Sequence, residues 1–183
     1  MKFLSDIRLL LLGLWLGAAV FFIGVAQSSF AVLPSRELAG TVVNRTLMIL
    51  NFSGLGISVL LILTSLFVGK AANRFWLWTE RFLLLIVAAA CAVGQFVIAI
   101  WLQFTKAQMG GKPIDEVAVD DPLRVQFNNL HQYSEWMLLV GMAAALLAFF
   151  IIANRRSRTA AVVEKSSTTT NDPFDFSKEF VKK

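Results

Sequence analysis

Polar residues recur every seven positions within one long apolar stretch of the sequence. Asn44, Asn51, Ser58 and Ser65 have this spacing, which keeps them on one face of an α-helix with a drift of about 20° per heptad. Amide and hydroxyl groups on a shared face can line a path for a small polar solute, an ion or a proton. The same groups can instead hydrogen-bond to neighbouring helices as packing contacts. The sequence leaves both interpretations open.

A second set of polar residues includes the only histidine of the chain. Arg124, Phe127, His131 and Ser134 follow one another at intervals of three, four and three residues, which places all four on one face of a helix. Glu135 follows His131 by four residues and could orient the imidazole, as carboxylates do at proton-transfer and metal sites. A histidine that only caps a helix or bonds to a neighbouring helix would fit the same pattern.

The motifs of common catalytic and metal centres do not occur in the sequence. It contains no His pair, Cys pair, G-x-S-x-G or H-E-x-x-H motif. Ser134, His131 and Glu135 are adjacent on one helix and cannot form a nucleophile, base and orienting group. The single cysteine, Cys91, fits a small core residue. We therefore expect no catalytic residue, no metal, no cofactor and no enzyme activity.

Four apolar runs predict the elements that position these residues. The chain has 183 residues, of which 57% are hydrophobic and 16% charged, with a mean hydropathy of +0.67, a composition far from that of a soluble globular domain. The uncharged runs 9–35, 46–69, 82–105 and 136–154 each have about the 20 residues that span a bilayer. We predict an all-α integral membrane bundle of four transmembrane helices at about 7–33, 40–69, 76–104 and 134–154.

Local signals set the limits of these helices and the domain organisation. Pro34 blocks continuation of the first helix, and Asp121 before Pro122 is a helix-start signal. A short outer amphipathic helix is therefore expected at about 122–133, before the last transmembrane helix. The domain prediction is a transmembrane domain over 1–156 and a disordered, hydroxyl-rich cytoplasmic tail over 157–183. Within the tail, residues 172–176 could serve as a docking peptide or be solvated like the rest.

The distribution of positive charge predicts the orientation. The formal net charge is +5, and the placement of the cations argues for a membrane surface rather than nucleic acid. Eight lie near the two termini and the link between the second and third runs: Lys2, Arg8, Lys70, Arg74, Arg81, Arg155, Arg156 and Arg158. Five lie on the opposite side: Arg36, Arg45, Lys106, Lys112 and Arg124. The positive-inside rule then places both termini in the cytoplasm.

The first apolar run allows two interpretations. A cleaved signal peptide would explain the cations that precede it, whereas its length and Asp6 favour a retained helix. A retained helix also explains Gly13 and Gly17, whose spacing lets a partner backbone approach closely. Together with Gly54, these glycines are predicted helix-packing positions.

The candidate polar cavity comprises Asn44, Arg45, Asn51 and Gln95. We expect Asn44 and Asn51 to meet the His131 face in the outer half of the bundle. Arg45 needs either to snorkel to the interface or to pair with an acid, for which Glu135, Asp120 and Asp121 are available. Gln95 could be a structural hydrogen-bonding group.

Two motifs resemble the transmembrane protein 205-like family, whose bacterial members carry a domain-of-unknown-function label. The first half of the resemblance rests on Trp15, Gly17, Phe21, Phe22, Phe30, Leu33-Pro34, Ala39-Gly40 and Asn51. The second rests on Asp121-Pro122-x-Arg124-x-x-Phe127-x-x-x-His131-x-x-Ser134. Around Ile98, Ile100 and Phe104 the chain is apolar where eukaryotic members are polar. The resemblance implies a four-helix membrane protein with a shared face at Arg124, Phe127, His131 and Ser134, and it implies no activity.

Two classes of function follow. The first is an integral membrane protein that handles a small solute, ion or proton through a polar intramembrane cavity. The second is a non-transporting scaffold that binds a partner membrane protein or a second copy of itself. For both, the expected location is the bacterial inner membrane, with the lipid bilayer as partner and no nucleic acid.

Overall fold

The computed structural model describes residues 2–66, 74–110 and 112–170, which are helical over most of their length. In chain order the elements are α1 (Lys2–Val32), α2 (Arg36–Leu66), α3 (Arg74–Val93), the π-helical η1 (Gly94–Ile98), α4 (Ala99–Gln108), the short 3₁₀ helix η2 (Ile114–Glu116) and α5 (Pro122–Thr170). The described chain contains no strand. The all-α class is therefore confirmed.

Four helical stretches are long and apolar enough to cross a membrane: Phe3–Val32, Arg36–Leu66, Arg74–Gln108 and Pro122–Arg155. Their outward faces carry large apolar side chains, such as Phe21, Ile49 and Phe96. An exposed surface of this kind suits lipid rather than water. The prediction of a four-helix membrane bundle is thus confirmed.

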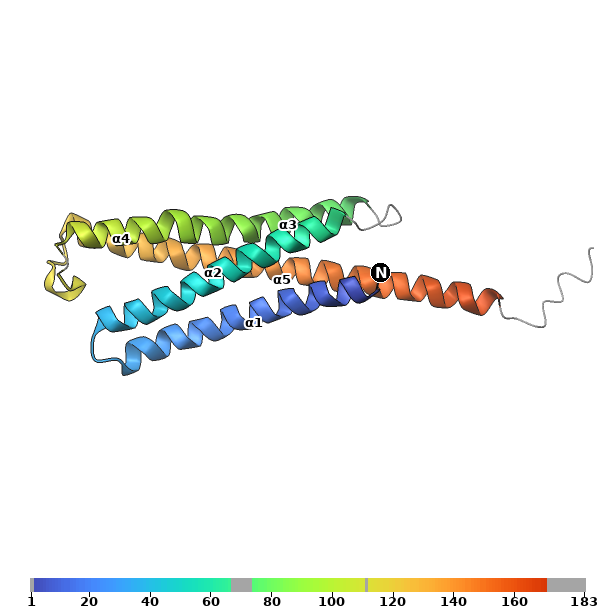
Figure 1. The fold of residues 1–183 in the computed structure, drawn as a ribbon, viewed down its shortest axis with the longest axis horizontal. Helices are drawn as coiled ribbons and strands as arrows, with labels where there is room; N and C mark the ends of the chain where they lie inside the picture. Colours follow the sequence, from blue (N-terminus) through green and yellow to red (C-terminus); the bar gives the residue numbers. More distant parts are fainter. Residues whose placement is uncertain (1, 67–73, 111, 171–183) are drawn as a thin grey trace, which may run out of the picture.

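The helices form two antiparallel pairs that lie side by side (Figure 1). Helix α1 packs on α2 and α5, and α3 packs on α2 and α5. The connecting residues 33–35 and 112–121 lie at one end of the bundle, which we call the hairpin end. Figure 1 shows the α1–α2 pair diverging there from α4 and α5. The start of α1 lies toward the opposite end, which we call the termini end.

Two predicted helix signals act as expected at the hairpin end. Helix α1 ends at Val32, two residues before Pro34. Helix α5 begins at Pro122, and the Asp121 carboxylate accepts a hydrogen bond of 2.8 Å from the Leu123 amide as an N-cap. In the same way, the Ser35 hydroxyl accepts a hydrogen bond from the Leu38 amide before α2.

Several predicted boundaries differ from the structure. Helix α1 begins at Lys2 rather than 7, α2 at Arg36 rather than 40, and the third stretch covers Arg74 to Gln108 rather than 76–104. The predicted limits followed the apolar runs, whereas backbone hydrogen bonding carries each helix into its charged flanks. Residues 67–69, the predicted end of the second helix, lie outside the described residues.

The last helix shows the largest difference. The predicted short helix 122–133 and fourth helix 134–154 are one continuous helix, α5, which extends to Thr170. The structure continues α5 through residues 157–170, where the sequence predicted a disordered tail. Residues 171–183, with the candidate docking peptide 172–176, lie outside the described residues. Arg, Ala, Glu and Lys, which favour helix, recur through 155–165 and account for the continuation.

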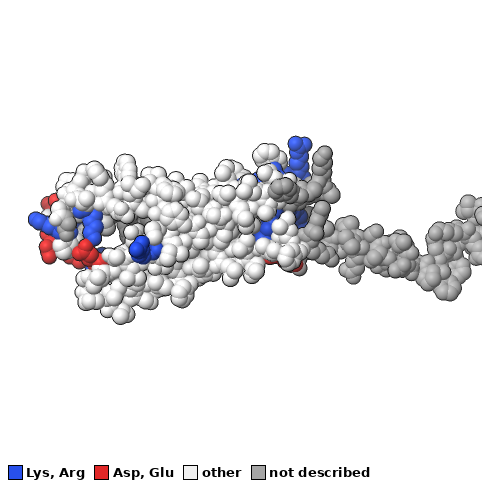
Figure 2. Space-filling view, in the orientation of Figure 1, with Lys and Arg blue, Asp and Glu red and all other residues white. Residues whose placement is uncertain are grey.

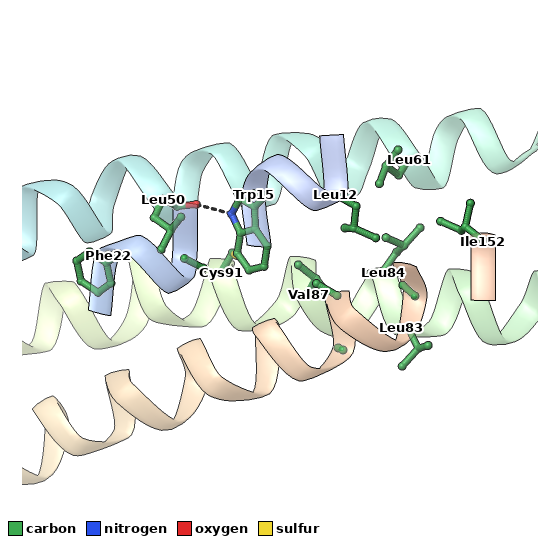
Figure 3. Close-up of a cluster of buried hydrophobic side chains, with 14 of the residues drawn as sticks. Leu12, Trp15, Phe22, Leu50, Leu61, Leu83, Leu84, Val87, Cys91 and Ile152 are labelled. Carbon is green, nitrogen blue, oxygen red and sulfur yellow. Dashed lines mark hydrogen bonds between the residues drawn. The ribbon is translucent and has the colours of Figure 1, made fainter. Parts of the chain in front are cut away.

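The core extends through the bundle from Val43 on the hairpin side to Ile152 toward the termini end, and Figure 3 shows it in close-up. Leu12, Leu61 and Leu84 are almost completely buried there. Trp15 of α1 lies across α2, and its indole Nε1 donates a 3.0 Å hydrogen bond to the Leu50 carbonyl. Gly54 makes room for this indole, because a Cβ at that position would lie 2.5 Å from Trp15 Nε1. The core therefore closes the bundle below the hairpin end.

Candidate functional site

A cavity of about 340 Å³ opens in the hairpin half of the bundle. Helices α2 and α5 form two of its walls, and η1 and α4 form the third. Its polar lining residues are Thr41, Asn44, Asn51, Gln95, Gln103, Asn128, His131 and Ser134, and its charged ones are Arg36, Glu37, Lys106, Lys112 and Arg124. This volume falls within the usual range of small-molecule sites.

The cavity brings together most of the residues singled out by the sequence. Seven of them line the same space. Helix α2 contributes Asn44 and Asn51, η1 contributes Gln95, and α5 contributes Arg124, Phe127, His131 and Ser134. The two helical faces inferred from spacing thus lie opposite each other at the hairpin end.

Two predicted site residues do not line this cavity. Arg45 is exposed, and no acid among the described residues pairs with it, so of the two alternatives the pairing with Glu135, Asp120 or Asp121 does not occur. Its position follows from helix geometry, since one residue beyond Asn44 is a turn of about 100°. Glu135 also lies outside the lining, with its Oε1 3.5 Å from His131 Nε2.

A π-helical segment shapes one wall of the cavity. Over Gly94–Ile98 the helix widens, and the Ala99 amide donates to the Gly94 carbonyl five residues earlier. Single π-turns of this kind often occur at functional sites. Gly94 faces Asn51 of α2, and a Cβ on Gly94 would lie 3.2 Å from Asn51 Nδ2. The missing side chain therefore gives the Asn51 amide its space.

Asn51 and Ser134 form the floor of the cavity. They are only 7% and 9% exposed, and neither has a hydrogen-bond partner within the described part of the chain. Both also line a void of about 10 Å³ beneath the cavity, next to Trp15 and Cys91, which is close to the smallest space that holds one water. Buried amides and hydroxyls usually have a partner, and one left without costs stability.

Ion pairs join the walls at the mouth of the cavity. Lys106 of α4 lies 2.5 Å from Glu37 of α2, and Arg36 lies 3.1 Å from Asp115 in η2. The side chains of both pairs are about half exposed to solvent. Ion pairs in such positions contribute little to stability. The Arg124 guanidinium donates to the Val117 carbonyl. Charged side chains of both signs gather at this end, whereas the middle of the bundle is nearly free of them (Figure 2).

The remaining residues of the heptad pattern serve packing. The Ser58 hydroxyl donates to the Gly54 carbonyl at 2.7 Å, and Ser65 accepts a 2.9 Å hydrogen bond from Arg81 Nε. The pattern of four residues therefore divides at the bundle middle. Asn44 and Asn51 line the cavity, and the two serines are satisfied within the core.

The three predicted packing glycines have different surroundings. A Cβ on Gly54 would come within 2.7 Å of Cys91 Sγ as well as clashing with Trp15, so Gly54 is a close-contact position. A Cβ on Gly13 would only reach ordinary contact with Phe149, and one on Gly17 would meet nothing within 4 Å. Gly17 is exposed and makes no close helix contact within the described chain.

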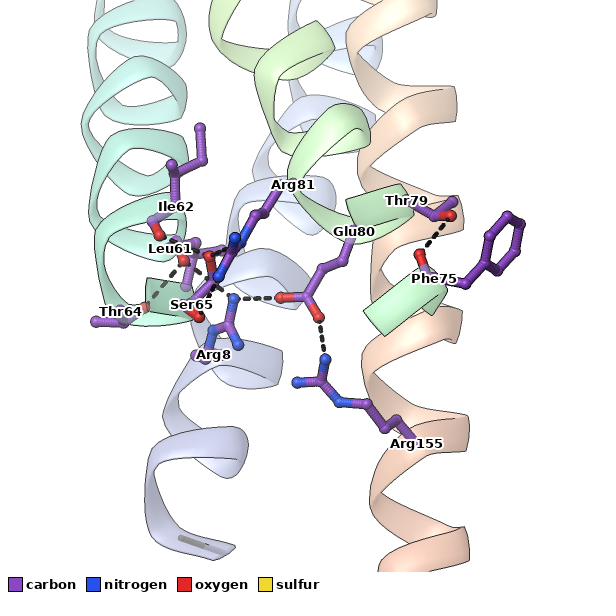
Figure 4. Close-up of polar contacts among 10 residues, drawn as sticks. All are labelled: Arg8, Leu61, Ile62, Thr64, Ser65, Phe75, Thr79, Glu80, Arg81 and Arg155. Carbon is purple, nitrogen blue, oxygen red and sulfur yellow. Dashed lines mark hydrogen bonds and ion pairs between the residues drawn. The ribbon is translucent and has the colours of Figure 1, made fainter. Parts of the chain in front are cut away.

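Sequence reasoning missed a charged cluster at the termini end (Figure 4). Glu80 of α3 pairs with Arg8 of α1 and lies 2.8 Å from Arg155 of α5. Arg8 also donates to the Leu61 carbonyl of α2 at 3.0 Å. Arg8 and Glu80 are 2% and 0% exposed. The cluster thus links all four helical stretches.

The sequence did contain a signal for this cluster. Arg8 precedes Leu12, Trp15 and Ala19, all buried, at the four-three-four spacing of a single helix face. Its charge was interpreted as an interfacial cation because it lies near the chain start. An arginine in register with a buried face indicates a buried partner instead.

Comparison with known protein families assigns the chain to one of them. Residues 10–110, more than half of the chain, match the family model described as a domain of unknown function, DUF4149. The chain belongs to the DUF4149 family. The match covers most of α1 and all of α2, α3, η1 and α4, but not α5. It supports the uncharacterised-membrane-family part of the resemblance, and the transmembrane protein 205-like label stays a resemblance.

No curated protein and no solved structure matches the chain. The DUF4149 model itself describes no activity. Functional inference therefore depends on the cavity and its residues.

Proposed function

We propose that this DUF4149 protein binds a small solute in the cavity at the hairpin end. The observation that supports this most directly is the floor of the cavity. Asn51 is more than nine-tenths buried as a residue, and its amide borders the open space but has no hydrogen-bond partner within the described chain. A ligand or ordered water in that space would satisfy it.

The shape of the cavity supports binding from one side of the membrane. Trp15, Cys91 and Gly54 pack together below Asn51, and the core fills the bundle beyond them. A solute that enters at the hairpin end would therefore stop at the floor. Transport to the other side would require Trp15 to move away from Gly54, so we propose a resting state that is open at the hairpin end and closed toward the termini end.

The proposed location is the bacterial inner membrane, with both termini in the cytoplasm. The positive-inside rule supports this orientation, and the hairpin end would then face away from the cytoplasm. The proposed role involves no catalysis, cofactor or nucleic acid. The lipid bilayer surrounds the bundle.

Cysteine accessibility tests the proposal. In a Cys91→Ala background, we would introduce His131→Cys and Asn44→Cys in the cavity, with Tyr133→Cys and Arg45→Cys as neighbours at matched depth. A membrane-impermeant, charged thiosulfonate reagent added to intact cells should modify the cavity positions faster than their neighbours. Equal rates at both positions of each pair would contradict a water-filled cavity. Modification only in inverted vesicles would reverse the proposed orientation.

A scaffold role has one specific observation in its favour. Gly17 lies exposed on α1 with open space around it, so a helix of a partner or of a second copy could approach closely there. Gly17→Leu should dissociate such a complex in a crosslinking assay and leave the accessibility of Asn44→Cys unchanged. If Gly17→Leu changes neither complex size nor crosslinking, the scaffold role loses its support.

A further inference from the structure

The charge of the cavity lining defines the class of solute, an inference that depends on the proposed binding function. Four cations line the cavity, Arg36, Lys106, Lys112 and Arg124, against the single acid Glu37. Glu37 is already paired with Lys106, and Arg36 is paired with Asp115. The lining therefore has an excess of positive charge that its own acids do not neutralise.

Two of these cations keep donors available for a ligand. Lys112 has no ion pair among the residues that the structure describes. Arg124 bonds to the Val117 carbonyl through Nη1, and a guanidinium has five N–H donors in total. Asp121, which accepts a hydrogen bond from the Leu123 amide, lies outside the cavity lining, as do Glu116 and Asp120.

Apart from the cations, apolar side chains form a large part of the cavity wall, beside the uncharged polar residues given above. Nine apolar side chains line it, including Phe30, Leu102 and Phe127. Arg124 and Ser134 are ten residues apart on α5, a rise of about 15 Å. The cavity is thus elongated, with cations toward its mouth, walls of both apolar and polar side chains, and a polar floor.

We propose that the cavity binds an amphiphilic organic anion. A carboxylate or phosphate group is held by Arg124 and Lys112, since an arginine binds such groups through parallel hydrogen bonds. The apolar body lies along Phe127 and Leu102 toward Asn51. A membrane lipid headgroup and a water-soluble amphiphile share this chemistry, and the experiment distinguishes these two sources.

The test uses the full-length protein in a non-ionic detergent with three probes of equal chain length: decanoate, decanol and decyltrimethylammonium. Equilibrium binding should be at least about tenfold tighter for decanoate than for the cationic probe, given the strength of charged hydrogen bonds. Arg124→Gln with Lys112→Gln should abolish this preference and leave decanol binding unchanged. Arg124→Lys should keep most of it, and Arg45→Gln, an exposed cation outside the cavity, should keep all of it.

Each outcome separates the ligand class from the binding function. If all three probes bind equally and Asn51→Leu changes their affinity, the anion class is overturned and the proposed function stands. If no probe binds and the cavity cysteines are unreactive, both fail. If Arg45→Gln abolishes the preference as strongly as Arg124→Gln, the assignment to the cavity is overturned.

Nanodiscs identify the source of the anion. Competition of decanoate by phosphatidylglycerol but not by phosphatidylcholine would support the anion class and assign it to a lipid headgroup. Retention of decanoate in both lipids would support a water-soluble amphiphile. Displacement by both lipids alike would overturn the role of the negative charge.

Discussion

Glu80 lies between two arginines from opposite ends of the chain, Arg8 of α1 and Arg155 of α5, and pairs with both. The Coulomb attraction holds three helices together at the termini end, where the Arg8 contact to the Leu61 carbonyl adds the fourth. Buried ion pairs of this kind add little net stability when compared with apolar packing, but removal of one partner leaves the other charge buried.

Glu80→Gln should therefore destabilise the protein strongly. It removes the carboxylate with which Arg8 and Arg155 both pair, at an expected cost of about 3–5 kcal/mol. Thermal unfolding in detergent, monitored by size-exclusion chromatography, measures the loss of stability. Glu37→Gln breaks a half-exposed pair and is the matched control, with an expected cost of at most about 1 kcal/mol. Equal melting temperatures for the two variants would contradict a structural role for the cluster.

Gly54→Ala should destabilise the core. Its Cβ would lie 2.5 Å from Trp15 Nε1 and 2.7 Å from Cys91 Sγ, so the indole must move, at a cost of about 1–3 kcal/mol. Gly56→Ala, two residues away on α2, meets nothing within 4 Å and should be neutral or stabilising because alanine favours helix. Thermal unfolding compares the two, and a stable Gly54→Ala variant would contradict the Trp15 contact.

Asn51→Leu distinguishes a ligand-binding amide from a packing amide. Because the amide has no partner within the described chain, leucine should leave the stability of the ligand-free protein unchanged or raise it by about 1–3 kcal/mol. An amide that joined two helices would produce a loss instead. Ser58→Ala, which removes a satisfied hydroxyl outside the cavity, is the control and should lower stability by about 1 kcal/mol.

Gly94→Ala should act through Asn51. The added Cβ would lie 3.2 Å from Asn51 Nδ2, so the amide must shift by a few tenths of an ångström. A double-mutant cycle with Asn51→Ala should give a coupling energy of at least about 0.5 kcal/mol, because the contact is removed in that background. If the effects of the two substitutions on the free energy of unfolding were additive, Gly94 and Asn51 would not interact.

The sequence predicted the number of membrane-spanning stretches from the length of the apolar runs, and the two polar faces from periodicity. The repeat of Asn44 and Asn51 and the spacing from Arg124 to Ser134 specify faces without any tertiary information. The π-turn at Gly94 was not predictable from one glycine, since glycine is common in membrane helices. Arg8 and Glu80 were missed because the count of cations near a membrane surface ignored the face on which each one lies.

Helix α5 is a single rod of 49 residues that contributes Ser134 to the cavity and Arg155 to the charged cluster. These two positions are 21 residues apart, or about 32 Å along the axis. The interval contains no proline, and its one glycine, Gly141, is buried within the bundle, so the helix transmits a tilt from one site to the other. A tilt of α5 that widens the cavity would then move Arg155 relative to Glu80. Ligand binding in the cavity at the hairpin end would in this way strain the ion pairs at the termini end.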